Sequence, residues 1–228
     1  FWSIFFCALT IFWIFKNTLP PAWDQSYYLE GSEHLYQTLR YEGLWSFLEE
    51  TTKVLGRKAP LLPISTLPLY LIFGSSHQIA LLINVLFFII FVYFYYRLAK
   101  NFVGEKIAVG AVLVTSTMPL FYGLVRNYFV EFGLMVLVTI WIYLLSKSGG
   151  LTKKNYMLGL GVVSGLGMLM KFDFFLFVAG PLAFVLFERF KKIGLVKLSK
   201  ILFARSLYLA VPLILIAFPW YFRNIKTV

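Results

Sequence analysis

The sequence predicts an all-α integral membrane protein in which residues 1–228 form a single transmembrane domain. Hydrophobic residues make up 60% of the chain and aromatic residues 20%, whereas a soluble globular domain is usually about 45–50% apolar. Seven apolar runs are long enough, or nearly so, to cross about 30 Å of hydrocarbon. We therefore expect about seven transmembrane helices, near 1–16, 77–97, 106–124, 129–146, 156–170, 173–188 and 201–220.

An eighth apolar run, residues 61–73, is not expected to cross the membrane. It is only thirteen residues long and contains Pro63 and Pro68. Internal prolines remove helix hydrogen bonds, and this length is typical of a segment that enters or lies on the membrane without spanning it. We predict a re-entrant or interfacial helix here.

The basic residues indicate how the chain is oriented. If residues 61–73 do not cross, the Lys- and Arg-rich loops 97–106, 147–154 and 189–200 all fall on one side, which the positive-inside rule makes cytoplasmic. The first loop, residues 17–58, and eight of the ten acidic residues then lie outside. The net charge of +11 is explained by these loops, so nucleic acid is not an expected partner.

The first extracytoplasmic loop is expected to form two short amphipathic juxtamembrane helices. Apolar residues recur there at helical spacing in two groups, Tyr28, Leu35 and Leu39, and then Leu44, Phe47 and Leu48.

The ends of the chain and its only cysteine give further expectations. The chain opens on Phe1 inside an apolar run and stops at Val228 after another, so we expect the front part of a longer protein without a cleavable signal peptide. Cys7 is alone, which excludes an intrachain disulfide. Glycines at 159, 161, 165 and 167 permit close packing of a helix against a neighbour.

Five short motifs occur in an order and on a side of the membrane that are familiar from one enzyme class. They are residues 23–28 (Trp-Asp-Gln-Ser-Tyr-Tyr), 58–62 (Lys-Ala-Pro-Leu-Leu), 126–131 (Arg-Asn-Tyr-Phe-Val-Glu), 165–171 (Gly-Leu-Gly-Met-Leu-Met-Lys) and 219–224 (Pro-Trp-Tyr-Phe-Arg-Asn). With them the chain resembles the GT-C class of polytopic glycosyltransferases, nearest to the protein O-mannosyltransferases and the lipid A aminoarabinose transferase. Three positions depart from the family pattern: Gln25 stands where Glu is frequent, Glu131 where Asp is typical, and Ala59 where Pro is usual.

The resemblance implies transfer of a sugar from a polyprenyl-phosphate donor to an acceptor hydroxyl, with inversion, at the extracytoplasmic face. Such a reaction needs a base, cations for the departing phosphate and an apolar groove for the lipid. Asp24, which follows a Pro-Pro turn, suits the general base, and Glu131 is the second candidate carboxylate. The expected phosphate- and substrate-binding residues are Lys58, Arg126, Lys171, Arg223, Tyr27 and Trp220.

Simpler interpretations remain open for several of these residues. Asp24 can also cap the following helix, Lys58 and Arg223 can be interfacial anchors, and Glu131 can simply neutralise Arg126. No cofactor is clearly implied, although Asp24 and Glu131 are candidates to share a divalent metal ion.

The alternative functions are a polytopic transporter and a non-catalytic membrane scaffold. The expected location is the plasma membrane of a prokaryote or the endoplasmic reticulum of a eukaryote.

Overall fold

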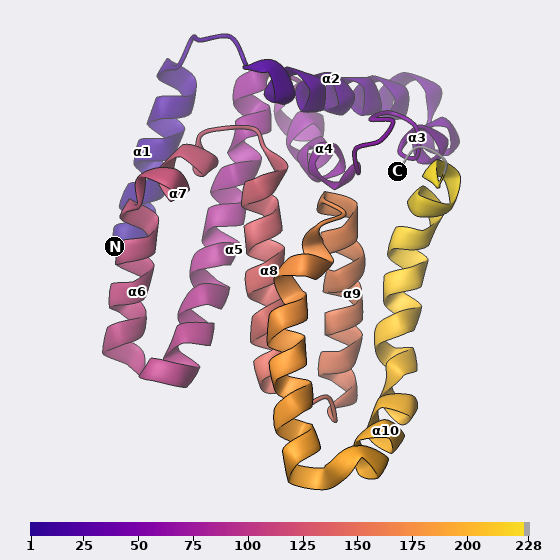
Figure 1. The fold of residues 1–228 in the computed structure, drawn as a ribbon. Helices are drawn as coiled ribbons and strands as arrows, with labels where there is room; N and C mark the ends of the chain where they lie inside the picture. Colours follow the sequence, from indigo (N-terminus) through magenta and orange to yellow (C-terminus); the bar gives the residue numbers. More distant parts are fainter. Residues whose placement is uncertain (226–228) are drawn as a thin grey trace.

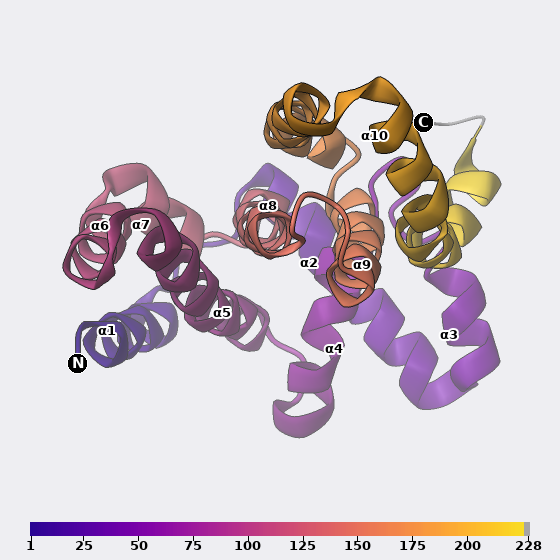
Figure 2. The ribbon, with the colours of Figure 1, turned by 90° about the horizontal axis from the view of Figure 1, so that it is seen from below.

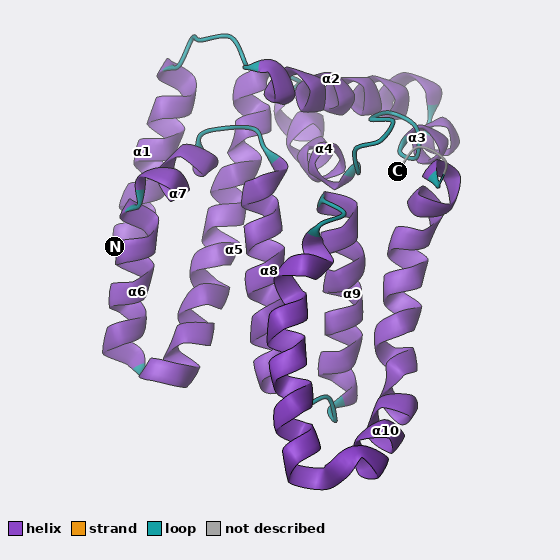
Figure 3. Ribbon diagram, viewed as in Figure 1, coloured by secondary structure: helices purple, strands orange, loops and turns teal. Residues whose placement is uncertain are grey.

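The computed structural model describes residues 1–225, and all regular structure within them is helical (Figure 3). The elements in chain order are α1 (Trp2–Lys16), α2 (Trp23–Gln37), a short π-helix η1 (Thr38–Glu42), α3 (Leu44–Glu50), α4 (Leu61–Phe73), α5 (His77–Val103), α6 (Glu105–Thr117), α7 (Pro119–Val125), α8 (Val130–Lys147), α9 (Lys154–Met170) and α10 (Phe174–Asn224). The predicted all-α fold class is confirmed for this part of the chain.

The helices form an upright bundle with a second layer across one end (Figure 1). The long helices α5, α8, α9 and α10 run side by side, and α2, α3 and α4 lie over the end at which α5 and α8 begin. Seen along the bundle, the long helices appear end-on while α2 and α4 extend across them (Figure 2). The loop residues that join the two layers are therefore gathered at one end of the molecule.

The expected count of seven membrane-spanning helices is not confirmed. Among residues 1–225, α5, α8 and α10 are long and apolar enough to cross a membrane, and α6 with α7 makes a fourth span if the two helices, bent by 70°, count as one. Helices α1 and α9 have 15 and 17 residues, fewer than a typical span needs. Two of the predicted spans, 173–188 and 201–220, belong to α10, which turns back on itself at Gly194 (φ 73°).

Helix α4 has the bounds predicted from its sequence, and it lies across the direction of the long helices (Figures 1 and 2). It packs mainly against α2 and α5, with Leu62, Thr66 and Tyr70 buried. Gly74 ends the helix with a positive φ of 81°, a conformation that glycine adopts without steric cost. This placement fits a segment that does not cross the membrane.

The two helices expected in the first loop are present as α2 and α3. In α2, Tyr28 and Leu35 are buried, as their spacing predicted. In α3, by contrast, Leu44 and Leu48 are exposed. The predicted surface character of this loop therefore holds for α3, whereas α2 is part of the core.

Glycines bring α9 and α10 into close contact, as the sequence predicted. A Cβ atom on Gly161 would lie 2.3 Å from the backbone oxygen of Leu209, and one on Gly165 would lie 2.8 Å from Ile216 Cβ. The Tyr221 hydroxyl also donates a hydrogen bond to Met168 O at 2.9 Å. These contacts fix the second arm of α10 beside the end of α9.

Candidate active site

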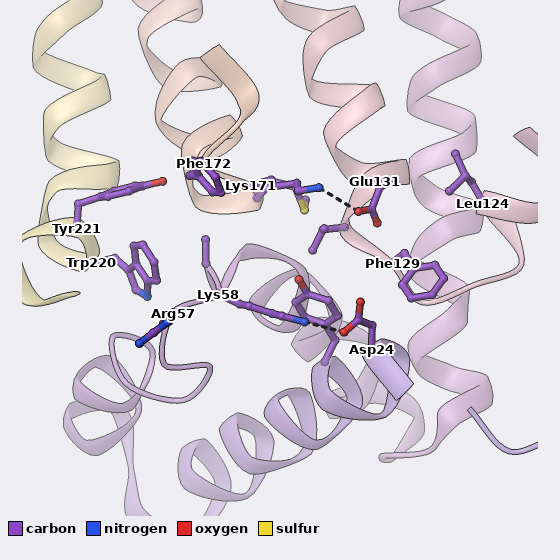
Figure 4. Close-up of a pocket in the computed structure, with 14 residues that line it drawn as sticks. Asp24, Arg57, Lys58, Leu124, Phe129, Glu131, Lys171, Phe172, Trp220 and Tyr221 are labelled. Carbon is purple, nitrogen blue, oxygen red and sulfur yellow. Dashed lines mark hydrogen bonds and ion pairs between the residues drawn. The ribbon is translucent and has the colours of Figure 1, made fainter. Parts of the chain in front are cut away.

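A pocket of about 430 Å³ opens where the two layers meet (Figure 4). Five segments far apart in the sequence contribute to its wall: the start of α2, residues 57–59, residues 124–131 around the start of α8, residues 170–172 after α9, and residues 220–221 of α10. The pocket brings together five of the eight sequence-predicted site residues: Asp24, Lys58, Glu131, Lys171 and Trp220.

Asp24 and Lys58 form an ion pair in the pocket, with Lys58 Nζ 2.9 Å from Asp24 Oδ1. Asp24 lies in the first turn of α2, where the helix dipole favours a negative charge. The N-cap of α2 is Ala22, and no side-chain cap hydrogen bond forms there, so the structure does not support the capping interpretation of Asp24. The ammonium of Lys58 also lies 4.9 Å from the ring centroids of both Tyr27 and Tyr28.

Glu131 is paired with Lys171 on the other side of the pocket, with a distance of 3.2 Å from Oε1 to Nζ. Glu131 occupies the first turn of α8, and Lys171 is the C-cap of α9. Lys171 Nζ also lies 3.7 Å from Asp173 Oδ2. The considered pairing of Glu131 with Arg126 is therefore not what the structure shows, because Lys171 occupies that position.

The structure does not bring three of the predicted residues to the pocket wall. The Arg126 guanidinium stacks on Tyr122 at 3.7 Å and on Trp13 at 4.8 Å, and burial lowers its pKa. Arg223 pairs with Glu49 at 3.7 Å. The Tyr27 hydroxyl donates a hydrogen bond to Leu55 O at 2.7 Å.

Arg57 and Tyr28 are among the pocket residues that the sequence analysis did not predict. Arg57 lines the pocket beside Lys58, and its place next to the Lys58 motif was the available signal. Tyr28 is buried between the layers; this burial, and secondarily the charges of Glu131 and Asp24, raise the pKa of its phenol. The 23–28 motif indicated that this segment belongs to the site, but it did not indicate that the Tyr28 side chain lines the pocket.

A divalent metal ion does not fit the side chains found here. Within residues 1–225 no group of three or more His, Cys, Asp and Glu side chains is arranged to hold a metal ion. Asp24 and Glu131 each have a lysine as ion-pair partner. We therefore derive no step of the reaction through a metal.

The pocket combines two carboxylates and three cations with an apolar wall that includes Leu124, Phe129 and Phe172. A carboxylate can accept a proton from a hydroxyl, and Lys and Arg side chains bind phosphate oxygens. The apolar wall can contact a hydrocarbon chain. These are the three chemical needs of sugar transfer from a lipid phosphate.

Comparison with known proteins identifies the family. A sequence model of the dolichyl-phosphate-mannose-protein mannosyltransferase family matches residues 57–221. This match includes Lys58, Glu131 and Lys171, whereas Asp24 precedes it and Arg223 follows it. No curated protein and no solved structure matches the chain. Because the match covers well over half of the sequence, the chain belongs to this GT-C family and is a membrane glycosyltransferase.

Proposed function

We propose that this enzyme transfers a sugar from a polyprenyl-phosphate donor to an acceptor hydroxyl, with inversion at the sugar carbon and Asp24 as general base. The observation that carries this proposal is the pocket in which Asp24, from α2, faces cations from two other segments (Figure 4). The family supports a polyprenyl-phosphate sugar as the general kind of donor.

In the proposed reaction the acceptor oxygen attacks the anomeric carbon while Asp24 takes the hydroxyl proton. The bond between the anomeric carbon and the phosphate oxygen breaks, and the polyprenyl phosphate leaves with the electron pair. A single displacement of this kind inverts the sugar carbon and needs only one basic carboxylate. Glu131, whose charge Lys171 balances at 3.2 Å, is the second candidate for the base.

We place the departing phosphate against Lys58, Arg57 and Lys171, which line the same pocket. Arg57 can hold two phosphate oxygens at once through its planar guanidinium. Arg126 and Arg223 are left out of this phosphate site because their guanidinium groups have partners elsewhere. The polyprenyl chain is expected to leave the pocket along Phe129 and Phe172, toward the lipid.

We also propose that the pocket faces the extracytoplasmic side. The Lys- and Arg-rich loops at 97–106, 147–154 and 189–200 lie at the opposite end of the bundle (Figure 1), and such loops favour the cytoplasm. The proposed path through the membrane has seven crossings, namely α1, α5, α6 with α7, α8, α9 and the two arms of α10.

The test is Asp24→Asn in the full-length membrane protein, with Glu105→Gln as the matched control. Each change removes one carboxylate charge, at nearly constant side-chain size, from an exposed ion pair with a lysine. Asp24 pairs with Lys58, and Glu105 pairs with Lys100 at 2.7 Å at the far end of the bundle. Loss of such a pair costs about 0–1 kcal/mol of stability. Loss of a general base lowers turnover by a factor on the order of 100 or more.

Transfer is measured with a radiolabelled polyprenyl-phosphate sugar, and the melting temperature serves as the folding control. We expect Asp24→Asn to lose transfer and Glu105→Gln to retain it, with similar melting temperatures. Near-normal transfer by folded Asp24→Asn protein refutes the base assignment and makes Glu131 the next residue to test.

A further inference from the structure

Gln25, the residue after the proposed base, is buried and tied to a different part of the chain. The residue is only 7% exposed. Its amide nitrogen donates to Asn127 Oδ1 at 2.8 Å, and its amide oxygen accepts from the Tyr128 backbone N–H at 3.1 Å. Successive helix residues point about 100° apart, so Asp24 can face the pocket while Gln25 faces this neighbouring segment.

The segment held by Gln25 leads directly into α8, which carries the second carboxylate. Tyr128 precedes Phe129, the N-cap of α8, and Glu131 lies in the first turn of that helix. Fixing the backbone at residues 127–128 therefore fixes the start of α8. Through Gln25, the position of Asp24 on α2 and the position of Glu131 on α8 are linked by two hydrogen bonds.

Other buried side chains, from α2 itself and from two further helices, hold the same segment. Asn84 of α5 donates to Asn127 O at 2.8 Å and to Val125 O at 3.1 Å. The hydroxyl of Tyr128 is 2.7 Å from Ser32 Oγ of α2 and 2.5 Å from Thr66 Oγ1 of α4. Because these contacts hold residues 125–128 in place, the contact with Gln25 is made to a fixed segment.

The geometry requires glutamine rather than glutamate at position 25. The Tyr128 N–H can only donate, so the side-chain oxygen must face it, and the other end of the side chain must then donate to Asn127 Oδ1. A glutamate would keep the first bond but place a carboxylate oxygen against Asn127 Oδ1. Asn127 cannot turn its amide to compensate without losing its own donation to Gly123 O at 2.7 Å.

We propose that Gln25 is a positioning residue for sugar transfer, setting the spacing of the Asp24 and Glu131 carboxylates across the pocket. This inference rests on the proposed function, in which Asp24 is the base and Glu131 holds the phosphate-binding Lys171 in the same pocket. Misplacement of a reacting group by about 1 Å can cost a factor on the order of 100 in rate. We therefore expect replacement of Gln25 to lower kcat while donor affinity changes little.

The main test is Gln25→Glu in the full-length protein, with Gln37→Glu as control on the exposed face of the same helix. We expect kcat per folded molecule to fall roughly tenfold or more in Gln25→Glu. The affinity for a short-chain polyprenyl phosphate is expected to stay within about threefold of wild type, since Gln25 does not line the pocket. Gln37→Glu should behave as wild type in both measurements.

A pH series separates positioning from a general loss of structure. A buried glutamic acid regains the missing O–H donor when it is protonated, and burial favours that neutral form. The ratio of kcat in Gln25→Glu to kcat in wild type should therefore rise as the pH falls from about 8 to about 5. Dividing by the wild-type kcat removes the pH dependence that the two proteins share, since the charged pocket residues Asp24, Lys58, Glu131 and Lys171 are present in both.

If Gln25→Glu does not fold, Gln25→Asn decides the matter, because it is neutral but too short to reach both partners. A kcat per folded molecule within about twofold of wild type in the variants that fold overturns the positioning role, even if their melting temperatures fall. Asp24→Asn is assayed alongside. Normal transfer by Asp24→Asn refutes the base assignment, whereas inactive Asp24→Asn beside fully active Gln25 variants refutes the positioning role alone.

Discussion

Replacing Gly161 with alanine tests how closely α9 and α10 must pack. The added Cβ would lie 2.3 Å from the backbone oxygen of Leu209 and 2.9 Å from its carbonyl carbon. Ordinary van der Waals contact begins near 3.4 Å, so the two helices must separate by about 1 Å. Because the atoms that would overlap with this Cβ belong to the Leu209 backbone, rotation of a side chain cannot relieve the overlap.

The expected cost follows from two opposing effects. Overpacking a well-packed site costs about 1–3 kcal/mol, whereas alanine in a helix interior is about 1 kcal/mol more favourable than glycine. Gly110→Ala in α6 isolates the second effect, because nothing lies within 4 Å of its added Cβ. Gly159→Ala is intermediate, since its nearest neighbour is a movable side-chain carbon of Leu144 at 3.2 Å.

The three variants are compared by thermal unfolding in one detergent and by transfer activity. We expect melting temperatures to fall in the order Gly110→Ala, Gly159→Ala, Gly161→Ala, with Gly161→Ala below wild type. Transfer should fall in Gly161→Ala as well, because the same arm of α10 brings Trp220 to the pocket. A Gly161→Ala protein that melts as high as Gly110→Ala contradicts the close approach of these helices.

Three further outcomes are expected. Lys58→Ala should weaken donor binding and transfer, at a cost of roughly 2–4 kcal/mol in the transition state, and an unchanged donor dependence makes Lys58 only an anchor. Burial raises the pKa of Tyr128 from 10.0 to about 12. Burial of the neutral phenol therefore stabilises the fold fully below pH 10, and this stabilisation is lost as the pH rises toward about 12. Tyr128→Phe should make the melting temperature less sensitive to alkaline pH. Membrane-impermeant thiol reagents should label Trp45→Cys from outside and Val103→Cys only after permeabilisation, with native Cys7 as the background control, and labelling of both from one side refutes the proposed orientation.

Apolar runs and prolines predicted most of the helices because a helix that faces lipid is apolar along most of its length, which the sequence shows directly. Helix α4 has the predicted bounds, and α8 begins and ends within one residue of the predicted run at 129–146. The predicted span at 106–124 corresponds to two helices, α6 and α7, which are bent by 70° and together can make one span. It breaks at Met118, which is extended (ψ 134°) before Pro119, and a residue preceding proline is disfavoured in the α conformation.

The site was predicted less completely than the fold because ion pairing depends on distances that a sequence does not give. Asp24 and Lys58 were expected on one surface, and their pairing at 2.9 Å follows only from the packing of α2 against residues 57–59. Arg126 had the same motif support as Glu131, yet it points to Trp13 and Tyr122. Arg126 is the C-cap of α7 and Glu131 lies in the first turn of α8, so shared motif membership did not imply a shared site.

The charges that line the pocket suit the proposed reaction at each stage. Three cationic and two anionic side chains leave one net positive charge, which a sugar phosphodiester, with its single negative charge, neutralises. Transfer then releases a phosphate monoester of about −1.5 to −2, while Asp24 gains a proton and loses its charge, so the balance is kept through the chemical step. Once Asp24 gives up that proton, the product is left with a surplus of negative charge beside the carboxylates, and this repulsion favours release of the polyprenyl phosphate.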